Sequence, residues 1–270
     1  MKSNLLRLLL LMLLPTTALA NEQSCKVDLD KLIWTKAEYA LSGDTIVIQN
    51  QRVRLIGLYA PQKGKQHKFN SPSEPLADEA QLFLNKLLAN NDLEVGVEYD
   101  QTRIDNRNRQ LVHLFLRDGT SVQQQVLENG FALNRTLYNN TKHAKCYYQA
   151  ESKARKGQYQ IWDLLSQFPD AHFPLIRSSE VTNQDQGFRI IRGKVDSVNR
   201  SDTNYIINMD TTGIRVPQRH WGNFDYSQLK NLQGKTIEVR GYAYLFNEVM
   251  YIILDHPFAI DALNPVNRPA

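Results

Sequence analysis

Cysteine is almost missing from this sequence, which has 2 cysteines in 270 residues. So low a content excludes a disulfide-dense small scaffold and a cysteine-rich metal site. Glycine and proline are also scarce, at 13 and 10 residues, which excludes collagen-like and low-complexity chains. Beyond residue 20 there is no run of 18 apolar residues, so no membrane-spanning helix is expected there.

An excess of charge of one sign is missing as well. The chain carries 32 basic and 28 acidic residues, a formal net charge of +4 at pH 7. This balance excludes a uniformly basic protein of the kind that coats DNA, although it allows a local basic patch. The length and the 42% of hydrophobic residues are sufficient for one or two globular domains, each with its own core.

The first 20 residues have the layout of a secretory signal peptide. Lys2 and Arg7 form a short basic start, Leu8–Leu14 is an apolar run, and Ala18 and Ala20 form an A-x-A cleavage signal. The alternative is a membrane anchor, but the apolar run is too short to cross a hydrocarbon core of about 30 Å. We therefore expect this segment to be removed, leaving a secreted or periplasmic monomer without membrane contact.

Cys25 and Cys146 both lie beyond the expected signal peptide. In an oxidising compartment, two cysteines predict one disulfide. The loop that it closes would be stabilised by ~4–5 kcal/mol in the chain-entropy description. Two buried free thiols are the alternative.

Residues 21–166 form a first unit, within which residues 30–162 alternate between strand and helix patterns. Ser73 and Pro75 are typical of a helix start, and apolar residues then recur at helical spacing. Runs rich in β-branched residues predict strands, the first two of them forming a hairpin. The predicted strands are 45–48, 52–58, 93–99 and 110–116, and the predicted helices begin at residues 73, 121 and 141.

A second unit follows a polar, proline-containing segment at residues 167–187, which is typical of a linker. This unit spans residues 188–263, and residues 264–270 form a tail. Its predicted strands are 188–198, 205–209, 214–216, 236–244 and 250–254, with a helix near 226–232. Five strands with a helix between the third and the fourth are the order of a small Greek-key OB barrel. The expected fold class is therefore α+β and mainly β, since the first unit shares this core pattern and adds helices.

Four stretches of the first unit carry charged residues that suggest chemistry. They are Ser42–Thr45, Arg54–Gln62, Asp105–Leu111 and Glu151–Gly157. A carboxylate and two arginines at strand starts can converge on one mouth of a barrel. Arginine binds phosphate oxygens bidentately and neutralises charge that builds on phosphorus, so this set suits a phosphodiester. Carboxylates and backbone carbonyls are also the ligands that Ca²⁺ prefers.

Taken in order, these stretches resemble the thermonuclease family, the staphylococcal-nuclease-like proteins. The resemblance covers about residues 30–162 and rests on GDT, RLIGLYAP, DNRNR and an ESKAR ending followed by Trp162. It implies an OB barrel with three helices that cleaves DNA or RNA with Ca²⁺. The segment Gly234–Gly241, with Asp255–Pro257 after it, is similar to the C-terminal OB-like extension of some secreted bacterial members.

The resemblance assigns roles to three residues. Asp44 matches the metal-binding aspartate of the family, Arg54 matches its first phosphate-clamping arginine, and Arg109 matches the second. If the roles hold, these three side chains should face one another across one rim of the barrel.

Three other family positions are altered here. Tyr59 stands where the family has a second metal-binding aspartate, Ala60 where a threonine offers a carbonyl, and Gln62 where a glutamate acts as general base or positions water. A neutral phenol is a poor Ca²⁺ ligand, and a glutamine cannot accept a proton from water. Because positioned general-base catalysis is worth ~10²–10⁴-fold, we expect reduced activity unless another carboxylate has moved in. The candidates for that carboxylate are Glu74, Asp78, Asp100 and Asp105.

Structural explanations compete with these roles. Asp44 could belong to an ordinary strand-entry turn, an ion pair with Asp44 would account for Arg54, and Arg109 would suit a solvated turn. Further along, Lys63, Lys65 and Lys68 lie in a basic run that predicts a surface loop able to touch a phosphate backbone. Six aromatic residues of the second unit could stack on bases, although packing within the barrel is the favoured explanation. They are Tyr205, Trp221, Tyr242, Tyr244, Phe246 and Tyr251.

Two functions remain open from the sequence. One is Ca²⁺-assisted hydrolysis of phosphodiester bonds in DNA or RNA by a divergent secreted thermonuclease-like protein. Its activity would be reduced, because Tyr59 and Gln62 replace acidic residues. The other is a non-catalytic module that binds nucleic acid or protein and keeps Arg54 and Arg109 as anion contacts.

Overall fold

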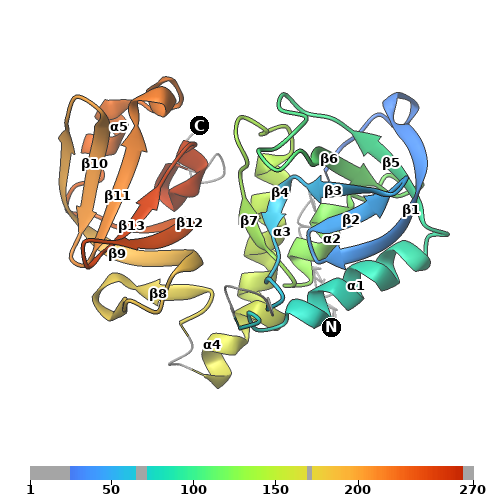
Figure 1. Cartoon of the computed structure of the whole chain (residues 1–270), viewed down its shortest axis with the longest axis horizontal. Helices are drawn as coiled ribbons and strands as arrows, with labels where there is room; N and C mark the ends of the chain where they lie inside the picture. The colour runs from blue at the N-terminus through green and yellow to red at the C-terminus, as the bar shows by residue number, and fades with distance from the viewer. Residues whose placement is uncertain (1–24, 65–71, 169–171, 264–270) are drawn as a thin grey trace, which may run out of the picture.

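The computed structural model describes residues 25–64, 72–168 and 172–263. The expected signal peptide and tail lie outside the described residues, as do Lys65 and Lys68. The chain folds into two lobes, and each lobe contains a five-stranded barrel (Figure 1). The mixed α+β fold class, with two barrels in series, is confirmed.

The first barrel closes in the strand order β1-β2-β3-β6-β5. Its strands are β1 (Ile33–Ser42), β2 (Thr45–Ile48), β3 (Gln51–Leu55), β5 (Glu94–Glu98) and β6 (Gln110–Phe115). The first half of β1 pairs with β5 and the second half pairs with β2, so this long strand closes the barrel. Only β3 and β6 run parallel, which is the OB arrangement.

Three helices cover this barrel, namely α1 (Ala77–Ala89), α2 (Val122–Glu128) and α3 (Ala144–Lys156). Ser121 caps α2 as predicted, because its hydroxyl accepts a hydrogen bond from the backbone N–H of Gln124. The predicted helix start at Ser73 is wrong. The Ser73 hydroxyl instead accepts from the backbone N–H of Gly64, and α1 begins only after Leu76, which has a left-handed backbone.

The predicted strand at residues 52–58 is broken in two. Gly57 has a φ of 86°, and a Cβ atom there would lie 2.2 Å from the ring of Tyr147. Glycine therefore permits both the turn and the close approach of the helix. Beyond this turn, β4 (Gly57–Tyr59) leaves the barrel and pairs with β7 (Leu133–Arg135).

The second barrel repeats the topology of the first. Strands β9 (Gly187–Arg200), β10 (Asn204–Met209), β11 (Thr212–Pro217), β13 (Val249–Ile253) and β12 (Thr236–Phe246) close into a ring, because β9 pairs with both β12 and β10. Here β11 and β13 run parallel, and α5 (Tyr226–Lys230) lies between β11 and β12. The five strands and the helix predicted for this unit are confirmed to within two residues at every end.

The segment expected to be a linker contains ordered structure. Helix α4 (Leu164–Gln167) ends at the first residue of this segment. Within the segment, β8 (Leu175–Arg177) pairs in parallel with β9. The domain boundaries themselves stay a prediction. Among the described residues, none of the helices combines the length and the apolar composition that crossing a bilayer requires.

Buried and half-buried ion pairs join the two lobes. Arg240 of β12 lies 2.8 Å from a carboxylate oxygen of Glu151 on α3, and both side chains are about 5% exposed. Arg155 of α3 makes two hydrogen bonds of 2.7 Å to Glu238 of β12, which also pairs with Arg192 of β9. In Figure 1, β7 and α3 accordingly lie on the side of the first lobe that faces the second.

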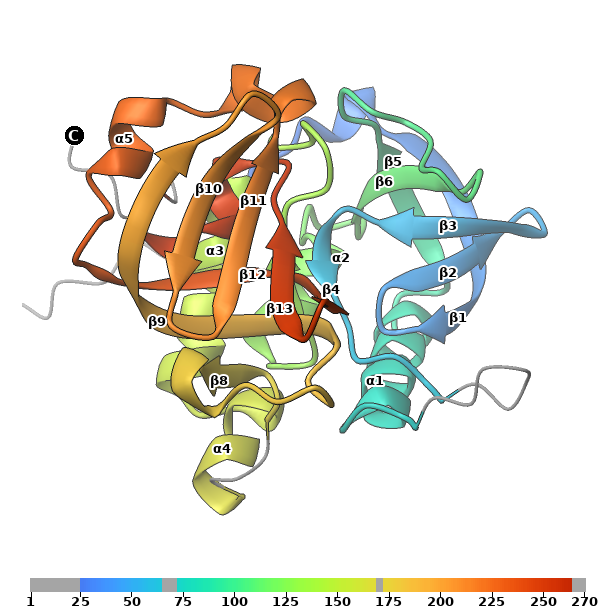
Figure 2. The ribbon, with the colours of Figure 1, turned by 60° about the vertical axis from the view of Figure 1, so that its left-hand side comes forward.

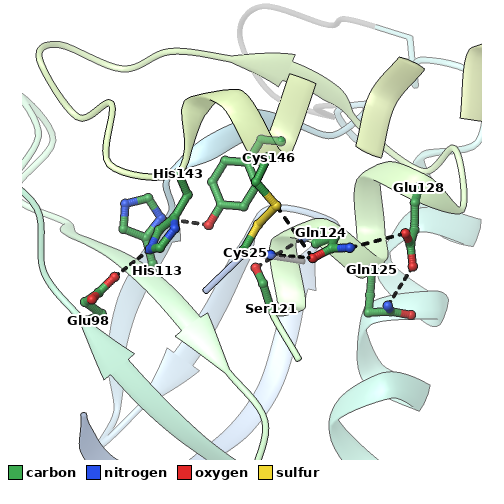
Figure 3. Close-up of a disulfide and its surroundings, with 10 residues drawn as sticks. Cys25, Glu98, His113, Ser121, Gln124, Gln125, Glu128, His143 and Cys146 are labelled. Atoms are coloured by element: carbon green, nitrogen blue, oxygen red, sulfur yellow. Dashed lines mark hydrogen bonds and ion pairs between the residues drawn. A yellow bond between two sulfur atoms is a disulfide. The ribbon is translucent and has the colours of Figure 1, made fainter. Parts of the chain in front are cut away.

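A disulfide joins Cys25, which precedes the first barrel, to Cys146 on α3, 121 residues further on (Figure 3). This confirms the predicted pairing. The side chain of Gln124 lies beside the bond, where its oxygen accepts from the backbone N–H of Cys25 at 3.1 Å. The bond ties the start of the chain to the helix that carries Glu151 and Arg155.

Removal of this disulfide should destabilise the protein. The variant in which Cys25 and Cys146 are both replaced by serine should lose about 3–5 kcal/mol in free energy of unfolding, because the unfolded chain regains a loop of 121 residues. Guanidinium unfolding followed by circular dichroism measures this loss. An unchanged midpoint would contradict the prediction, as would two thiols that react freely in the native protein.

The pairing of the lobes should weaken in acid. Burial alone would raise the pKa of Glu238, but hydrogen bonds and charge from Arg155 and Arg192 outweigh it and lower the pKa to about 2. A carboxylate with a depressed pKa stabilises the folded state above its unfolded pKa, and this contribution is lost as the pH falls through the folded value. Up to about 3 kcal/mol should therefore disappear between pH 5 and pH 2.

Urea unfolding across this pH range tests the assignment with Glu238→Gln. This variant should show a flatter pH dependence than the unsubstituted protein. Glu180→Gln is the matched control, since Glu180 is half exposed and its ion pair is with the exposed Arg177. Equal pH profiles for the protein and for Glu238→Gln would refute the linkage.

Candidate functional site

Asp44 lies in the turn between β1 and β2 and is completely buried. Its carboxylate accepts hydrogen bonds from the hydroxyls of Ser42 and Thr45, at 2.8 and 3.0 Å, and from the backbone N–H of Ala60 at 3.0 Å. It also forms an ion pair with Arg54. The negative charge of Asp44 is thus compensated within the fold.

Arg54 reaches Asp44 because β2 and β3 pair with Thr45 opposite Arg54. The guanidinium donates a second hydrogen bond to the carbonyl of Leu58 at 3.2 Å and is only 5% exposed. A buried arginine needs such partners, and this pair is the structural explanation that the sequence already offered. The guanidinium nevertheless reaches the surface of a cavity described below.

Tyr59 of β4 reaches the second lobe. Its ring stacks on Phe188 of β9 with 4.3 Å between the centroids, and its hydroxyl donates a 2.6 Å hydrogen bond to Glu74. Burial, followed by the nearby charge of Glu74, raises the pKa of this phenol above its ordinary value. Tyr59 therefore stays neutral, and its oxygen is engaged.

The amide group of Gln62 occupies the space between the two oxygens that the family resemblance assigns to a metal. Its nitrogen donates to the carbonyl of Ala60 at 2.7 Å and to the carboxylate of Asp44 at 3.3 Å. A neutral N–H donor thus holds both oxygens. The backbone N–H of Gln62 also donates a hydrogen bond to the carboxylate of Glu74 at 2.8 Å, which fixes the position of this residue.

This donor set does not fit Ca²⁺, which takes six to eight oxygen ligands. Asp44 offers a carboxylate that is already saturated, Tyr59 offers a neutral phenol, and the carbonyl of Ala60 is capped by Gln62. Among the described residues, no group of three or more histidine, cysteine, aspartate or glutamate side chains is arranged to hold a metal.

None of the four candidate carboxylates completes a metal shell. One carboxylate oxygen of Glu74 accepts hydrogen bonds from the hydroxyl of Tyr59 and the backbone N–H of Gln62. The other oxygen forms an ion pair with Arg189 of β9 at 3.3 Å. Of the four candidates, Glu74 is thus the one that contacts the altered positions, and its pair with Arg189 links the two lobes. The others are engaged elsewhere: Asp78 with Lys63, Asp100 with the backbone N–H of Lys142, and Asp105 with Arg109.

Arg109 follows the tight turn before β6, and its guanidinium pairs with one carboxylate oxygen of Asp105: Nε donates a hydrogen bond of 2.8 Å, and a terminal nitrogen lies at 2.7 Å. Burial raises the pKa of Asp105, but backbone and side-chain hydrogen bonds from Arg109 outweigh it, so the net shift is downward. Asp105 is thus a fixed anion that orients the arginine.

Four arginines line one cavity of about 300 Å³ at the edge of the first barrel, namely Arg54, Arg107, Arg109 and Arg135. Two carboxylates, Asp105 and Asp255, and the side chain of Gln62 also line it. The two arginines named by the sequence therefore meet in one cavity. Asp44 is not part of the lining, since it lies beneath Arg54.

Arg135 was not singled out by the sequence. It belongs to β7, and the pairing of β7 with β4 places it opposite Gly57. Its guanidinium lies over the ring of Tyr242 from β12, 4.8 Å from the centroid. No motif marks this residue, because its position follows from a three-residue strand and from contact with the second lobe.

The basic loop expected to contact phosphate is only partly described. Lys63 is described and forms a 2.6 Å ion pair with Asp78 at the start of α1. It does not line the arginine cavity. Lys65 and Lys68 lie outside the described residues, so their role stays a prediction.

The family model of the staphylococcal nuclease homologue matches residues 52–164, from β3 to the start of α4. The match identifies a staphylococcal nuclease homologue domain within the first lobe, and it ends before the second barrel. A comparison with curated proteins found no match.

Calcium should leave the protein unchanged, while Gln62→Glu should confer a response. In the unsubstituted protein, the amide of Gln62 binds the oxygens of Asp44 and Ala60, so Ca²⁺ should not raise the Tm of that protein. A glutamate there removes the N–H donor and adds a carboxylate beside Asp44. The variant should gain about 2.7 kcal/mol when Ca²⁺ reaches 100 times its Kd.

Thermal unfolding with Ca²⁺ and with chelator measures this response. Gln51→Glu is the control, because it adds the same charge at an exposed position at the start of β3. A calcium-dependent rise in Tm for the unsubstituted protein would show that the oxygens do accept a cation, and would overturn the interpretation.

Proposed function

We propose that the first lobe binds the phosphate groups of nucleic acid in the arginine cavity and does so without calcium-dependent hydrolysis. Family membership supports a nuclease-like domain. The observation that carries the proposal is the amide of Gln62, which bridges Asp44 and Ala60 while Arg54 and Arg109 still reach the cavity. In this proposal, the arginines that bind an anion in the family are present here as Arg54 and Arg109. The oxygens that would bind a cation, on Asp44 and Ala60, are occupied by Gln62.

The charge of the cavity supports an anionic ligand. Four guanidinium groups face two carboxylates, and one of these, Asp105, is already paired with Arg109. Guanidinium groups bind phosphate oxygens in a planar, bidentate manner. The interactions of Arg54 and Arg109 with buried carboxylates fix the orientation of both groups before any ligand arrives.

The competing function is a nuclease of reduced activity, which the family favours. Its mechanism needs a group that accepts a proton from water, and Gln62 cannot do so. Glu74, the nearest alternative, is held by Tyr59 and Arg189. The geometry therefore favours binding over hydrolysis.

The proposed site of action is a secreted or periplasmic one. The basis for this is the Cys25–Cys146 disulfide, since such bonds persist in oxidising compartments.

Arg109→Ala should weaken the binding of a fluorescent single-stranded oligonucleotide by about tenfold or more at low salt, because one charge-assisted contact is lost. The slope of log affinity against log salt should fall by about 1. Arg177→Ala is the matched control, since Arg177 is exposed on β8 and lies outside the cavity. Fluorescence anisotropy across a salt series gives both quantities.

Two outcomes would contradict the proposal. One is no binding of DNA or RNA by the unsubstituted protein at low salt. The other is cleavage that requires Ca²⁺ and is abolished in Arg109→Ala, which would support the nuclease instead.

A further inference from the structure

A second cavity, of about 420 Å³, lies beside the first, between the two lobes. The two cavities share four lining residues: Arg135, Tyr138, Tyr242 and Asp255. From there the second cavity continues along the second barrel, past Arg219 and His220 to Tyr244 and Ile253. The arginine cavity thus opens toward β12 and β13, which form one wall of the space between the lobes; Figure 2 shows the molecule turned by 60°.

An aromatic row leads away from this wall. Tyr242, Tyr244 and Phe246 alternate along β12 and are 48%, 37% and 58% exposed, while Ala243 between them is buried. Tyr251 on β13 lies opposite Tyr244, with 6.0 Å between the ring centroids. We call the three residues of β12 the aromatic row.

The other aromatic residues of this barrel behave differently. Tyr205 and Trp221 stack on each other at 4.4 Å, and Tyr205 is only 7% exposed. Packing therefore accounts for that pair, as favoured from the sequence. Tyr242 also packs edge-on against Tyr59 and Phe188, and Phe246 against Tyr251, but each ring of the aromatic row stays more than a third exposed. Tyr242 and Tyr244 line the second cavity.

The spacing of the row favours a single strand. Alternate residues of a β-strand are about 6.8 Å apart, which is twice the rise of about 3.4 Å per nucleotide in a duplex. Rings at this spacing can each receive a base only when neighbouring bases are separated from one another. A single strand allows this separation, whereas a duplex hides the faces of its bases.

Positive charge accompanies the row. Arg135 lies over Tyr242 at 4.8 Å, and Arg215 lies over Tyr251 at 4.9 Å from the ring centroid. Arg219 lines the second cavity together with Arg135. The row ends at the hairpin after Phe246, where Glu248 would repel a phosphate. Both the charge and the rings thus suit a short stretch of nucleic acid.

We propose that single-stranded nucleic acid runs from the arginine cavity, through the cavity between the lobes, onto the aromatic row, where Tyr244 and Phe246 stack on its bases. This inference rests on the proposed function, because the arginine cavity binds phosphate groups of the same strand. The second barrel then supplies base contacts, and the first supplies phosphate contacts.

The test uses the full mature chain and three fluorescent probes of 12 nucleotides: oligo-dT, an abasic strand of equal length, and a duplex. Tyr244→Ala and Phe246→Ala should each bind oligo-dT about 5- to 150-fold more weakly, the loss expected for one base stack. Binding of the abasic strand should change less than twofold. Tyr244→Phe, which keeps the ring, should bind oligo-dT like the unsubstituted protein.

Tyr39→Ala is the matched control, because Tyr39 is 50% exposed on β1 and lines neither cavity. Thermal unfolding of each variant checks the fold. If both row variants bind oligo-dT as the unsubstituted protein does, the aromatic row makes no base contact and the inference is overturned, while the arginine cavity stands. Equal losses on the duplex or on the abasic strand overturn it too. If the unsubstituted protein binds none of the probes, the proposed function itself fails.

Discussion

The buried ion pair between Glu151 and Arg240 is the constraint on which the arrangement of the two lobes depends. Arg240 also donates to the carbonyl of Asn134, and Glu151 accepts from the backbone N–H of the same residue, at 3.0 and 2.7 Å. Two charges withdrawn from water are tolerated only when each is paired and hydrogen-bonded. The pair therefore holds β7 against β12, and this contact brings Arg135 and Tyr242 together.

The contacts of Tyr59 and Gln62 explain physically why these residues suit the two positions at which the sequence departs from the family. Tyr59 gives a flat ring to stack on Phe188, and its hydroxyl joins Glu74 to the contact between the lobes. Gln62 then satisfies the oxygens of Asp44 and Ala60 with N–H groups. Of these two altered residues, Tyr59 contacts the second barrel, whereas the amide of Gln62 bonds within the first lobe.

Much of the fold was predictable because the determining signals are local. The strands of the second barrel follow β-rich runs between turns, and Ser121 marks the start of α2. Strand β1 went unpredicted because its polar face and its irregular register, shared between two partners, obscure the period of two. Likewise, the position of Arg135 depends on a contact between lobes, which no local pattern contains. The Asp44–Arg54 pair was foreseeable, since a strand arginine next to a turn aspartate has an obvious partner.

The contact of Tyr59 with Phe188 also bears on how such a chain can change over generations. A carboxylate introduced at residue 59 would be driven against an aromatic ring and close to Glu74, a like charge. A change of this residue alone to aspartate would thus destabilise the fold. Because Tyr59 stacks on a ring of the second barrel, single steps toward an acidic residue at this position lead through a less stable fold.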